Sequence, residues 1–101
     1  MRVLVLFDLP VGSAEERRAY TKFRKYLIKS GFLMMQESVY CKMALNQTAA
    51  GTIMEGVRKN CPQEGIVQML SITEKQYNKI ECICGEVTRK ILDTDERLVI
   101  L

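Results

Sequence analysis

Histidine and tryptophan are both absent from this chain of 101 residues. The absence of histidine removes the commonest general base at neutral pH, the catalytic triads that use it and every zinc site with an imidazole ligand. Any chemistry must therefore depend on carboxylates, a thiolate or a bound metal ion. Aromatic residues make up only 7% of the chain, so its core must be built mainly from Leu, Ile, Val and Met.

Long hydrophobic runs are also missing near the N-terminus. The apolar run from Met1 to Phe7 is far too short to cross a bilayer, and Asp8 and Pro10 follow it at once. It predicts neither a signal peptide nor a membrane anchor. We therefore expect a cytoplasmic protein with reduced thiols and no membrane partner.

The cysteines lack the spacing of a disulfide framework or of a zinc site. Cys41 and Cys61 lie far from Cys82 and Cys84, and no pair has the CxxC spacing. Cys82-Ile83-Cys84 supplies at most half of a thiolate zinc site. Buried cysteines in strands are the favoured interpretation, and no metal is assigned to them.

Length and charge set broad limits. A chain of this length, with 48% hydrophobic residues, can bury one modest core, so we expect a single domain over residues 1–101. The 15 Lys and Arg residues outnumber the 12 Asp and Glu residues by three. That excess is too small to establish nucleic-acid binding, so the distribution of the cations has to decide.

The hydrophobic pattern of residues 2–31 predicts a strand and then a helix. Arg2–Phe7 is a nearly unbroken apolar run of strand length. Ser13 and Glu16 have the spacing of a capping box, which marks the start of a helix that continues to Ser30. Gly31 is the left-handed residue that ends it. Apolar residues then fall on one arc of this helix: Ala19, Tyr20, Phe23, Tyr26 and Leu27.

The second half predicts a hairpin, a helix and a further strand. Phe32–Met35 and Ser38–Leu45 read as extended, with a polar turn or bulge between them. Asn46–Thr48 offers caps for a helix that ends before Pro62, although two glycines weaken it and tertiary packing must hold it. Ile66–Thr73 is the next strand, and Glu74 to Tyr77 is a single helical turn.

This order of elements predicts an α+β fold, the ferredoxin-like βαββαβ sandwich with an additional C-terminal strand. Both helices of that fold cover one face of the sheet, yet Val3, Val5 and Phe7 alternate with apolar Leu4 and Leu6. A homodimer that packs sheet against sheet would cover the second face. Residues 79–101 form an extension that we expect to pair in trans, with the dimer mate or with another protein.

Cations concentrate on one face of the first helix. Arg18, Lys22, Lys25 and Lys29 share a narrow arc, with Arg17 and Arg24 beside it. Such a row suits the phosphates of a duplex and reads no bases. The alternative is an ordinary solvated helix face, partly balanced by Glu15 and Glu16.

An ordered set of short motifs carries a family resemblance. The segments are Phe7-Asp8-Leu9-Pro10, Arg17-Arg18, Gly31, Gln36-Glu37-Ser38-Val39-Tyr40 and Glu96-Arg97-Leu98-Val99. At this spacing, and over essentially the whole chain, they resemble the small CRISPR-associated adaptation protein, and in particular members that accompany type II systems. The resemblance implies a homodimer with the fold predicted above. It also implies a magnesium-dependent endonuclease that acts on RNA or duplex DNA, and a bridge between integrase dimers during spacer insertion.

The resemblance also implies roles for particular residues. Asp8 would be the catalytic residue and the ligand of Mg²⁺ or another divalent cation. The cations at 17, 18, 22, 24, 25 and 29 would bind protospacer duplex, or single-stranded RNA. The tail residues Arg97, Leu98, Val99, Ile100 and Leu101 would bind the integrase subunit or the dimer mate. From the residues alone, the favoured interpretation of Asp8 is a cap on the turn before Pro10 or a partner for an arginine, ahead of a metal ligand.

Two functions from different classes therefore stay open. One is an architectural subunit of CRISPR adaptation, part of antiviral defence, whose dimer holds duplex DNA and docks the integrase. The other is a metal-dependent phosphodiesterase in which paired Asp8 carboxylates place a cation. The first is favoured as the biological role, with catalysis dispensable for spacer integration.

Overall fold

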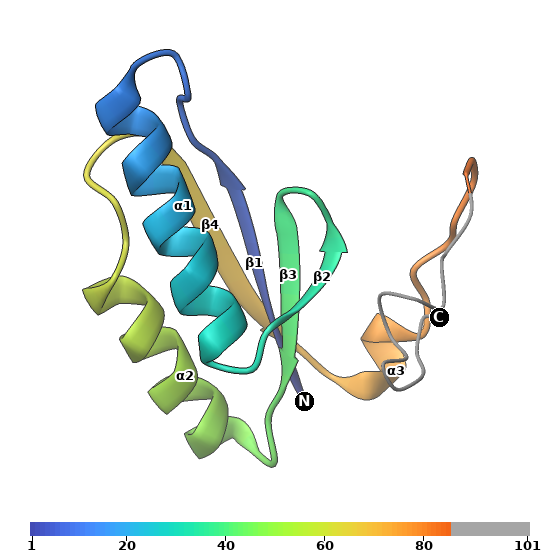
Figure 1. Ribbon diagram of the computed structural model, residues 1–101. Helices are drawn as coiled ribbons and strands as arrows, with labels where there is room; N and C mark the ends of the chain where they lie inside the picture. The colour runs from blue at the N-terminus through green and yellow to red at the C-terminus, as the bar shows by residue number, and fades with distance from the viewer. Residues whose placement is uncertain (86–101) are drawn as a thin grey trace.

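The computed structural model describes residues 1–85 of the chain (Figure 1). Strands alternate with helices as a split βαβ unit requires. The elements are β1 (Arg2–Asp8), α1 (Ala14–Lys29), β2 (Leu33–Gln36), β3 (Val39–Met43), α2 (Gln47–Lys59), β4 (Ile66–Ile72) and the short α3 (Glu74–Tyr77). The tail residues 97–101 and most of the proposed extension lie outside the described residues.

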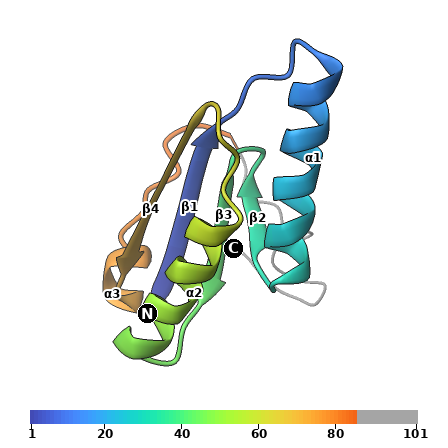
Figure 2. The same cartoon turned by 90° about the vertical axis from the view of Figure 1, so that its left-hand side faces the viewer.

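The strands form one sheet in the order β2-β3-β1-β4, and all neighbouring strands are antiparallel. Helices α1 and α2 cover one face of this sheet, whereas α3 lies on the other side (Figures 1 and 2). The predicted α+β class and the ferredoxin-like arrangement are therefore confirmed. In the described part of the chain, no helix is long and apolar enough to cross a membrane.

Helix α1 begins and ends as its sequence predicts. The Ser13 side chain accepts from the backbone N–H of Glu16, and the Glu16 side chain accepts in turn from the N–H of Ser13. Gly31 follows the C-cap with a φ of +97°, a conformation that glycine adopts without strain. Of the predicted apolar arc, Phe23 and Leu27 are buried and the two tyrosines are half-buried, but Ala19 is exposed.

The core lies between the sheet and the two long helices. Val3 and Val5 of β1 are completely buried, and Phe7 is nearly so. The Phe7 ring stacks on Tyr40 of β3 at 5.7 Å and meets Phe23 of α1 edge-on at 5.4 Å. Phe7 of β1 thus links the sheet to α1 through aromatic contacts.

Helix α2 approaches α1 closely at Gly56, a contact that could not be predicted from the low helix propensity of its glycines. Asn46 caps it by accepting from the N–H of Ala49. A Cβ on Gly56 would lie 2.6 Å from the Tyr26 hydroxyl of α1. Glycine therefore lets the two helices approach at this point, and tertiary packing offsets its low helix propensity.

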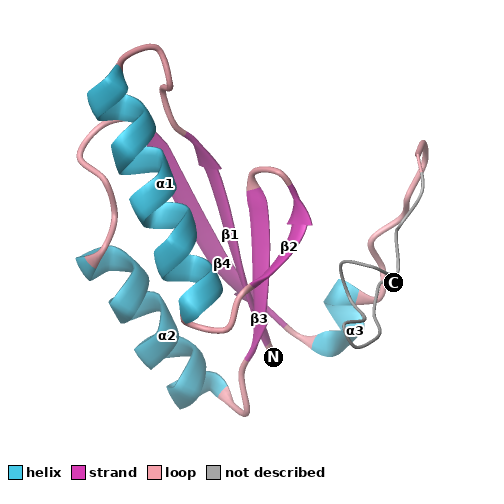
Figure 3. Ribbon diagram, viewed as in Figure 1, coloured by secondary structure: helices cyan, strands magenta, loops and turns pink. Residues whose placement is uncertain are grey.

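The hairpin and the last strand are shorter than predicted (Figure 3). β2 begins one residue later than expected and runs to Gln36, where a bulge interrupts its register with β3. β3 covers only Val39–Met43. β4 stops at Ile72 because the Thr73 side chain caps α3 by accepting from the N–H of Gln76.

Candidate functional site

Asp8 is the last residue of β1 and is exposed, whereas the sequence placed it just beyond the strand. It pairs with Ile66 of β4. Side chains alternate along a strand, so Asp8 shares a face with Leu4 and Leu6, opposite the buried Val3, Val5 and Phe7. The carboxylate therefore belongs to the sheet face that α1 and α2 leave uncovered.

A glycine fixes the backbone around Asp8, and the sequence did not reveal this role. Gly65 has a φ of +94°, and a Cβ there would lie 2.8 Å from both the Asp8 carbonyl oxygen and Leu9 Cδ2. A larger residue would be strained and would push the end of β1 away from β4. The only sequence signal for it is a glycine directly before a strand.

The carboxylate of Asp8 is a ligand type that suits a hard cation, but each chain supplies only this one ligand at the site. Among the described residues, no three His, Cys, Asp or Glu side chains gather to hold a metal ion, and Asp8 takes part in no ion pair. Mg²⁺ is commonly held by one or two carboxylates, with water and substrate phosphates completing its shell. One exposed carboxylate per chain suits that mode if a second copy brings its own Asp8.

The outer surface of α1 carries a row of cations. Arg18, Lys22, Lys25 and Lys29 are all exposed, and within residues 1–85 none of them forms an ion pair. They lie on the side of α1 that points away from buried Phe23 and Leu27. The structure therefore brings these predicted residues together, across the sheet from Asp8.

Arg17 and Arg24 differ from the row, because each has a partner within the fold. Arg17 Nη1 donates to the carbonyl oxygens of Val11 and Gly12, at 3.2 and 3.4 Å. Arg24 Nε donates to the hydroxyl of buried Tyr40 at 2.9 Å. These two arginines stabilise the loop before α1 and the packing of α1 on β3, in addition to any contact they make with phosphates.

The uncovered side of the sheet, which we call the open face, is largely apolar. Register places these apolar side chains on it: Leu4, Leu6, Leu33, Val39, Met43, Ile66, Leu70 and Ile72. Leu70 is 45% exposed and Met43 63% exposed. Apolar side chains that are contiguous and this exposed indicate a surface for a partner.

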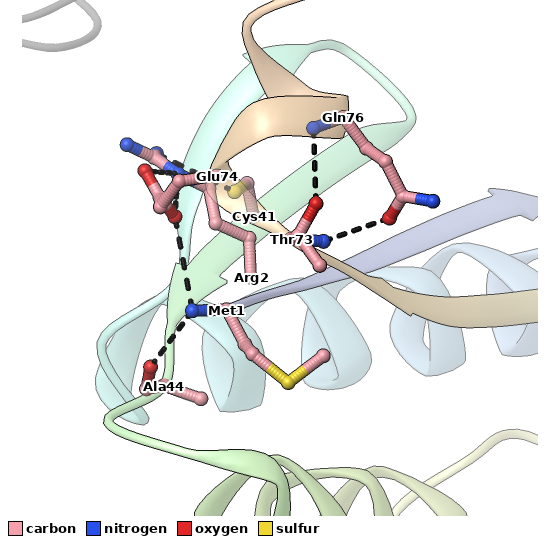
Figure 4. Close-up of polar contacts among 7 residues, drawn as sticks. All are labelled: Met1, Arg2, Cys41, Ala44, Thr73, Glu74 and Gln76. Carbon is pink, nitrogen blue, oxygen red and sulfur yellow. Dashed lines mark hydrogen bonds and ion pairs between the residues drawn. The ribbon is translucent and has the colours of Figure 1, made fainter.

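A polar network that the sequence did not predict closes one end of the open face (Figure 4). Arg2 Nε donates to both carboxylate oxygens of Glu74, at 3.1 and 2.9 Å, and the Arg2 guanidinium lies 3.9 Å from the centre of the Tyr77 ring. The N-terminal ammonium is 4.0 Å from the same carboxylate. These contacts hold α3 against the start of β1.

The cysteines correct one sequence interpretation. Cys41 is buried in β3 as expected, and burial raises the pKa of its thiol against the opposing effect of the Arg2 guanidinium. Cys82 and Cys84, however, are exposed and lie in no strand. The interpretation as buried strand cysteines is wrong for this pair.

Comparisons with known proteins agree on one family. The family model described as CRISPR associated protein Cas2 matches residues 1–80. A protein of Treponema denticola, named CRISPR-associated endoribonuclease Cas2, is 56% identical over 101 residues and covers all of both chains. A protein of that name from Streptococcus mutans serotype c is 43% identical, covering all of this chain and 93% of its own.

One solved structure agrees in fold. The crystal structure of Streptococcus pyogenes Cas2 at pH 6.5 superposes with a TM-score of 0.60 at 14% identity, covering 83% of this chain and 100% of that one. Sequence and fold therefore point the same way: the chain belongs to the Cas2 family of CRISPR-associated proteins.

Proposed function

We propose that the protein is a subunit of CRISPR adaptation that works as a homodimer, holds duplex DNA on the outer surfaces of its α1 helices and bridges the integrase during spacer insertion. The observation that carries the proposal is the row of exposed cations along α1, which form no ion pair within residues 1–85. Flexible cations on the back of a helix neutralise phosphates and read no base edges. That property suits a subunit that must accept spacers of any sequence.

The open face supports the homodimer. Its apolar side chains would be covered if two sheets packed face to face, as in other sheet sandwiches. Among the described residues β4 pairs only with β1, so its other edge offers backbone groups to a further strand. After α3 the chain leads away from its own sheet (Figure 1), in keeping with an extension that pairs in trans.

Charge reversal on α1 tests duplex binding. Arg18, Lys22 and Lys25 are changed together to glutamate, and the control changes exposed Lys59 at the end of α2 and exposed Lys75 of α3 instead. The α1 variant should bind DNA of any sequence at least tenfold more weakly. Its salt dependence should flatten by roughly one unit per lost phosphate contact.

A fluorescence-anisotropy titration of a short duplex at several salt concentrations, followed by an integration assay with the cognate integrase, reads both effects. The duplex proposal is wrong if the α1 variant binds and supports insertion like the control. The same titration with single-stranded RNA decides which nucleic acid the row prefers.

A second function is magnesium-dependent endonuclease activity: the relatives' name, CRISPR-associated endoribonuclease Cas2, favours the nuclease activity, and the exposed Asp8 carboxylate favours the metal. In a face-to-face dimer the two Asp8 residues would lie on the packed faces, where both carboxylates would hold Mg²⁺ with water and a substrate phosphate. Bound there, the ion would supply Lewis-acid assistance to hydrolysis. The close approach of Gly65 fixes the backbone at Asp8. Within the described residues, no group of three or more His, Cys, Asp or Glu side chains offers another metal site.

Replacing Asp8→Ala separates the two functions. The variant should lose magnesium-dependent cleavage of RNA and DNA, measured on labelled substrates with and without a chelator. Duplex affinity and spacer insertion should stay within about twofold of wild type, because the carboxylate lies across the sheet from the cations. If the Asp8→Ala variant stops spacer insertion while it still folds as a dimer and binds duplex, the purely architectural proposal is wrong, and metal chemistry is part of spacer insertion.

A further inference from the structure

Two exposed cysteines lie two positions apart in a segment without regular structure. Cys82 and Cys84 follow α3, where the chain leaves the sheet (Figure 1). Cys82 Sγ lies 3.4 Å from the carbonyl oxygen of Cys84 and 3.6 Å from that of Gly85. Gly85 has a φ of +90°. The backbone therefore turns back toward the Cys82 thiol.

We propose that Cys82 and Cys84 form a redox-active dithiol that closes to a disulfide when a low-molecular-weight disulfide such as glutathione disulfide is present. One cysteine thiolate attacks a glutathione sulfur, and one glutathione thiolate leaves. The second cysteine thiolate then attacks the mixed disulfide and releases the other glutathione. Two protein thiols are oxidised by two electrons, one glutathione disulfide is reduced to two thiols, and the two cysteine protons end on them.

The disulfide and an extended strand exclude each other. In a strand, the side chains of residues two positions apart point to the same side, and their Cβ atoms lie about 6.6 Å from one another. A disulfide requires Cβ atoms about 3.8 Å apart. Closing the Cys82–Cys84 bond therefore keeps the segment bent, as it is in this structure, and prevents it from adding to a sheet edge.

This consequence rests on the proposed pairing of the extension in trans. The reduced segment, with Ile80, Cys82 and Cys84 on one side of a strand, would pair with the mate, whereas the oxidised segment would not. The coupling must be reciprocal, since a strand that pairs also withdraws its thiols from the oxidant. Oxidation would thus weaken assembly, and assembly would slow oxidation.

The other cysteines provide internal controls. Cys41 is buried in β3, so an oxidant does not reach it. Cys61 is exposed at the end of α2 but has no neighbouring thiol in sequence, and its Sγ lies 3.4 Å from the carbonyl oxygen of Pro62. Cys61 therefore matches the dithiol in exposure and lacks the partner needed for ring closure.

Mass spectrometry of the full chain tests the disulfide itself. Reduced protein is incubated with glutathione disulfide, quenched in acid and mapped by peptide. Wild type should lose two hydrogen atoms within the peptide that holds Cys82 and Cys84, whereas Cys61 should gain only a glutathione adduct. Cys82→Ser should leave a lasting adduct on Cys84. Lasting adducts on both cysteines of wild type, with no internal bond, would overturn the proposal.

Assembly is measured separately, so that the two proposals fail in different ways. In a Cys61→Ser background, light scattering should show at least tenfold weaker association after oxidation, and the double variant Cys82→Ser/Cys84→Ser should not respond. A reduced protein that is monomeric at tens of micromolar would refute the dimer and with it the switch, while the mass data would still decide the disulfide. Equal association of reduced and oxidised protein would refute the switch alone.

Discussion

The two faces of the sheet use alternate residues of the same strands for different purposes. On the helix-covered face, Val3 and Val5 are completely buried under α1 and α2. On the open face, Leu70 is 45% exposed although it pairs with Leu4 of the same β1. One face therefore stabilises the single chain, and the other leaves apolar area exposed, which the proposed homodimer would cover.

The same division separates the candidate chemistry. Asp8 belongs to the open face, whereas the cations at positions 18, 22, 25 and 29 lie on the outer surface of α1. Helix α1 and helix α2 cover the opposite face of the sheet (Figure 2). A duplex lying along α1 of one chain would therefore not touch the Asp8 carboxylate of that chain. Single substitutions should therefore alter the proposed duplex binding and the proposed hydrolysis one at a time.

The largest expected effect is on the helix-covered face. Phe23→Ala removes a ring that is 1% exposed and meets Phe7 edge-on, so the free energy of unfolding should fall by about 3–5 kcal/mol. Leu33→Ala, on the open face, should cost under about 1 kcal/mol in dilute protein and more where the dimer forms. Urea unfolding at two protein concentrations checks both. Similar losses would mean that the faces do not differ.

Assembly should show the reverse asymmetry. Leu70→Asp places a charge on the open face and should weaken dimerisation at least 100-fold, or about 2.7 kcal/mol, because the carboxylate would be desolvated between the sheets. Ile28→Asp is the matched control, since Ile28 is 48% exposed on α1 and Leu70 is 45% exposed. Analytical ultracentrifugation should find the control dimeric. A Leu70→Asp dimer of wild-type affinity would exclude the open face as the interface.

A smaller effect distinguishes two glycines. Gly65→Ala should destabilise the fold by about 1–3 kcal/mol, because a Cβ would lie 2.8 Å from the Asp8 carbonyl oxygen at a φ of +94°. It should also lower magnesium-dependent cleavage by displacing Asp8. Gly51→Ala, in α2 with nothing within 4 Å, should instead stabilise the fold by about 0.5–1 kcal/mol. Thermal unfolding and the cleavage assay measure both variants. Equal changes in stability for Gly65→Ala and Gly51→Ala would contradict the close approach at Gly65.

The smallest effect is expected on duplex affinity, and it separates two neighbouring cations on α1. Arg24→Ala leaves the buried Tyr40 hydroxyl without its donor, which should cost about 1–3 kcal/mol of stability, and it should change duplex affinity little. Lys25→Ala should do the opposite, with unchanged stability and a duplex affinity lower by a few fold. Chemical unfolding and the anisotropy titration give both numbers. If Arg24→Ala weakens binding more than Lys25→Ala, phosphate contact is the main role of Arg24.

Much of the fold could be predicted because its signals are local. The capping box of Ser13 and Glu16, the glycine after α1 and the alternation along β1 each act within a few residues. Element bounds were less accurate, since hydrogen bonding between distant strands and the Thr73 cap decided where β2, β3 and β4 end.

The candidate site could be predicted only in part. The cations of α1 share a face because the helical period places them there, so the sequence was sufficient. It could not show that Arg17 and Arg24 have partners within the fold, since the contact of Arg24 with Tyr40 spans 16 positions. The exposure of Cys82 and Cys84 was likewise missed. The apolar pattern around them is typical of a strand, but the pattern cannot show whether that segment joins the sheet of its own chain.

By itself the sequence determined the family, the order of elements, the helix ends and the two-sided apolar character of β1. Only the tertiary structure decided which apolar side stays open, that Gly65 and Gly56 are places of close approach, and that Arg2 holds α3 through Glu74 and Tyr77. The physical reason is range. Periodicity and capping depend on neighbours along the chain, whereas burial, close approach and ion pairing join residues that are far apart in sequence, such as Arg2 and Glu74 at a separation of 72 positions.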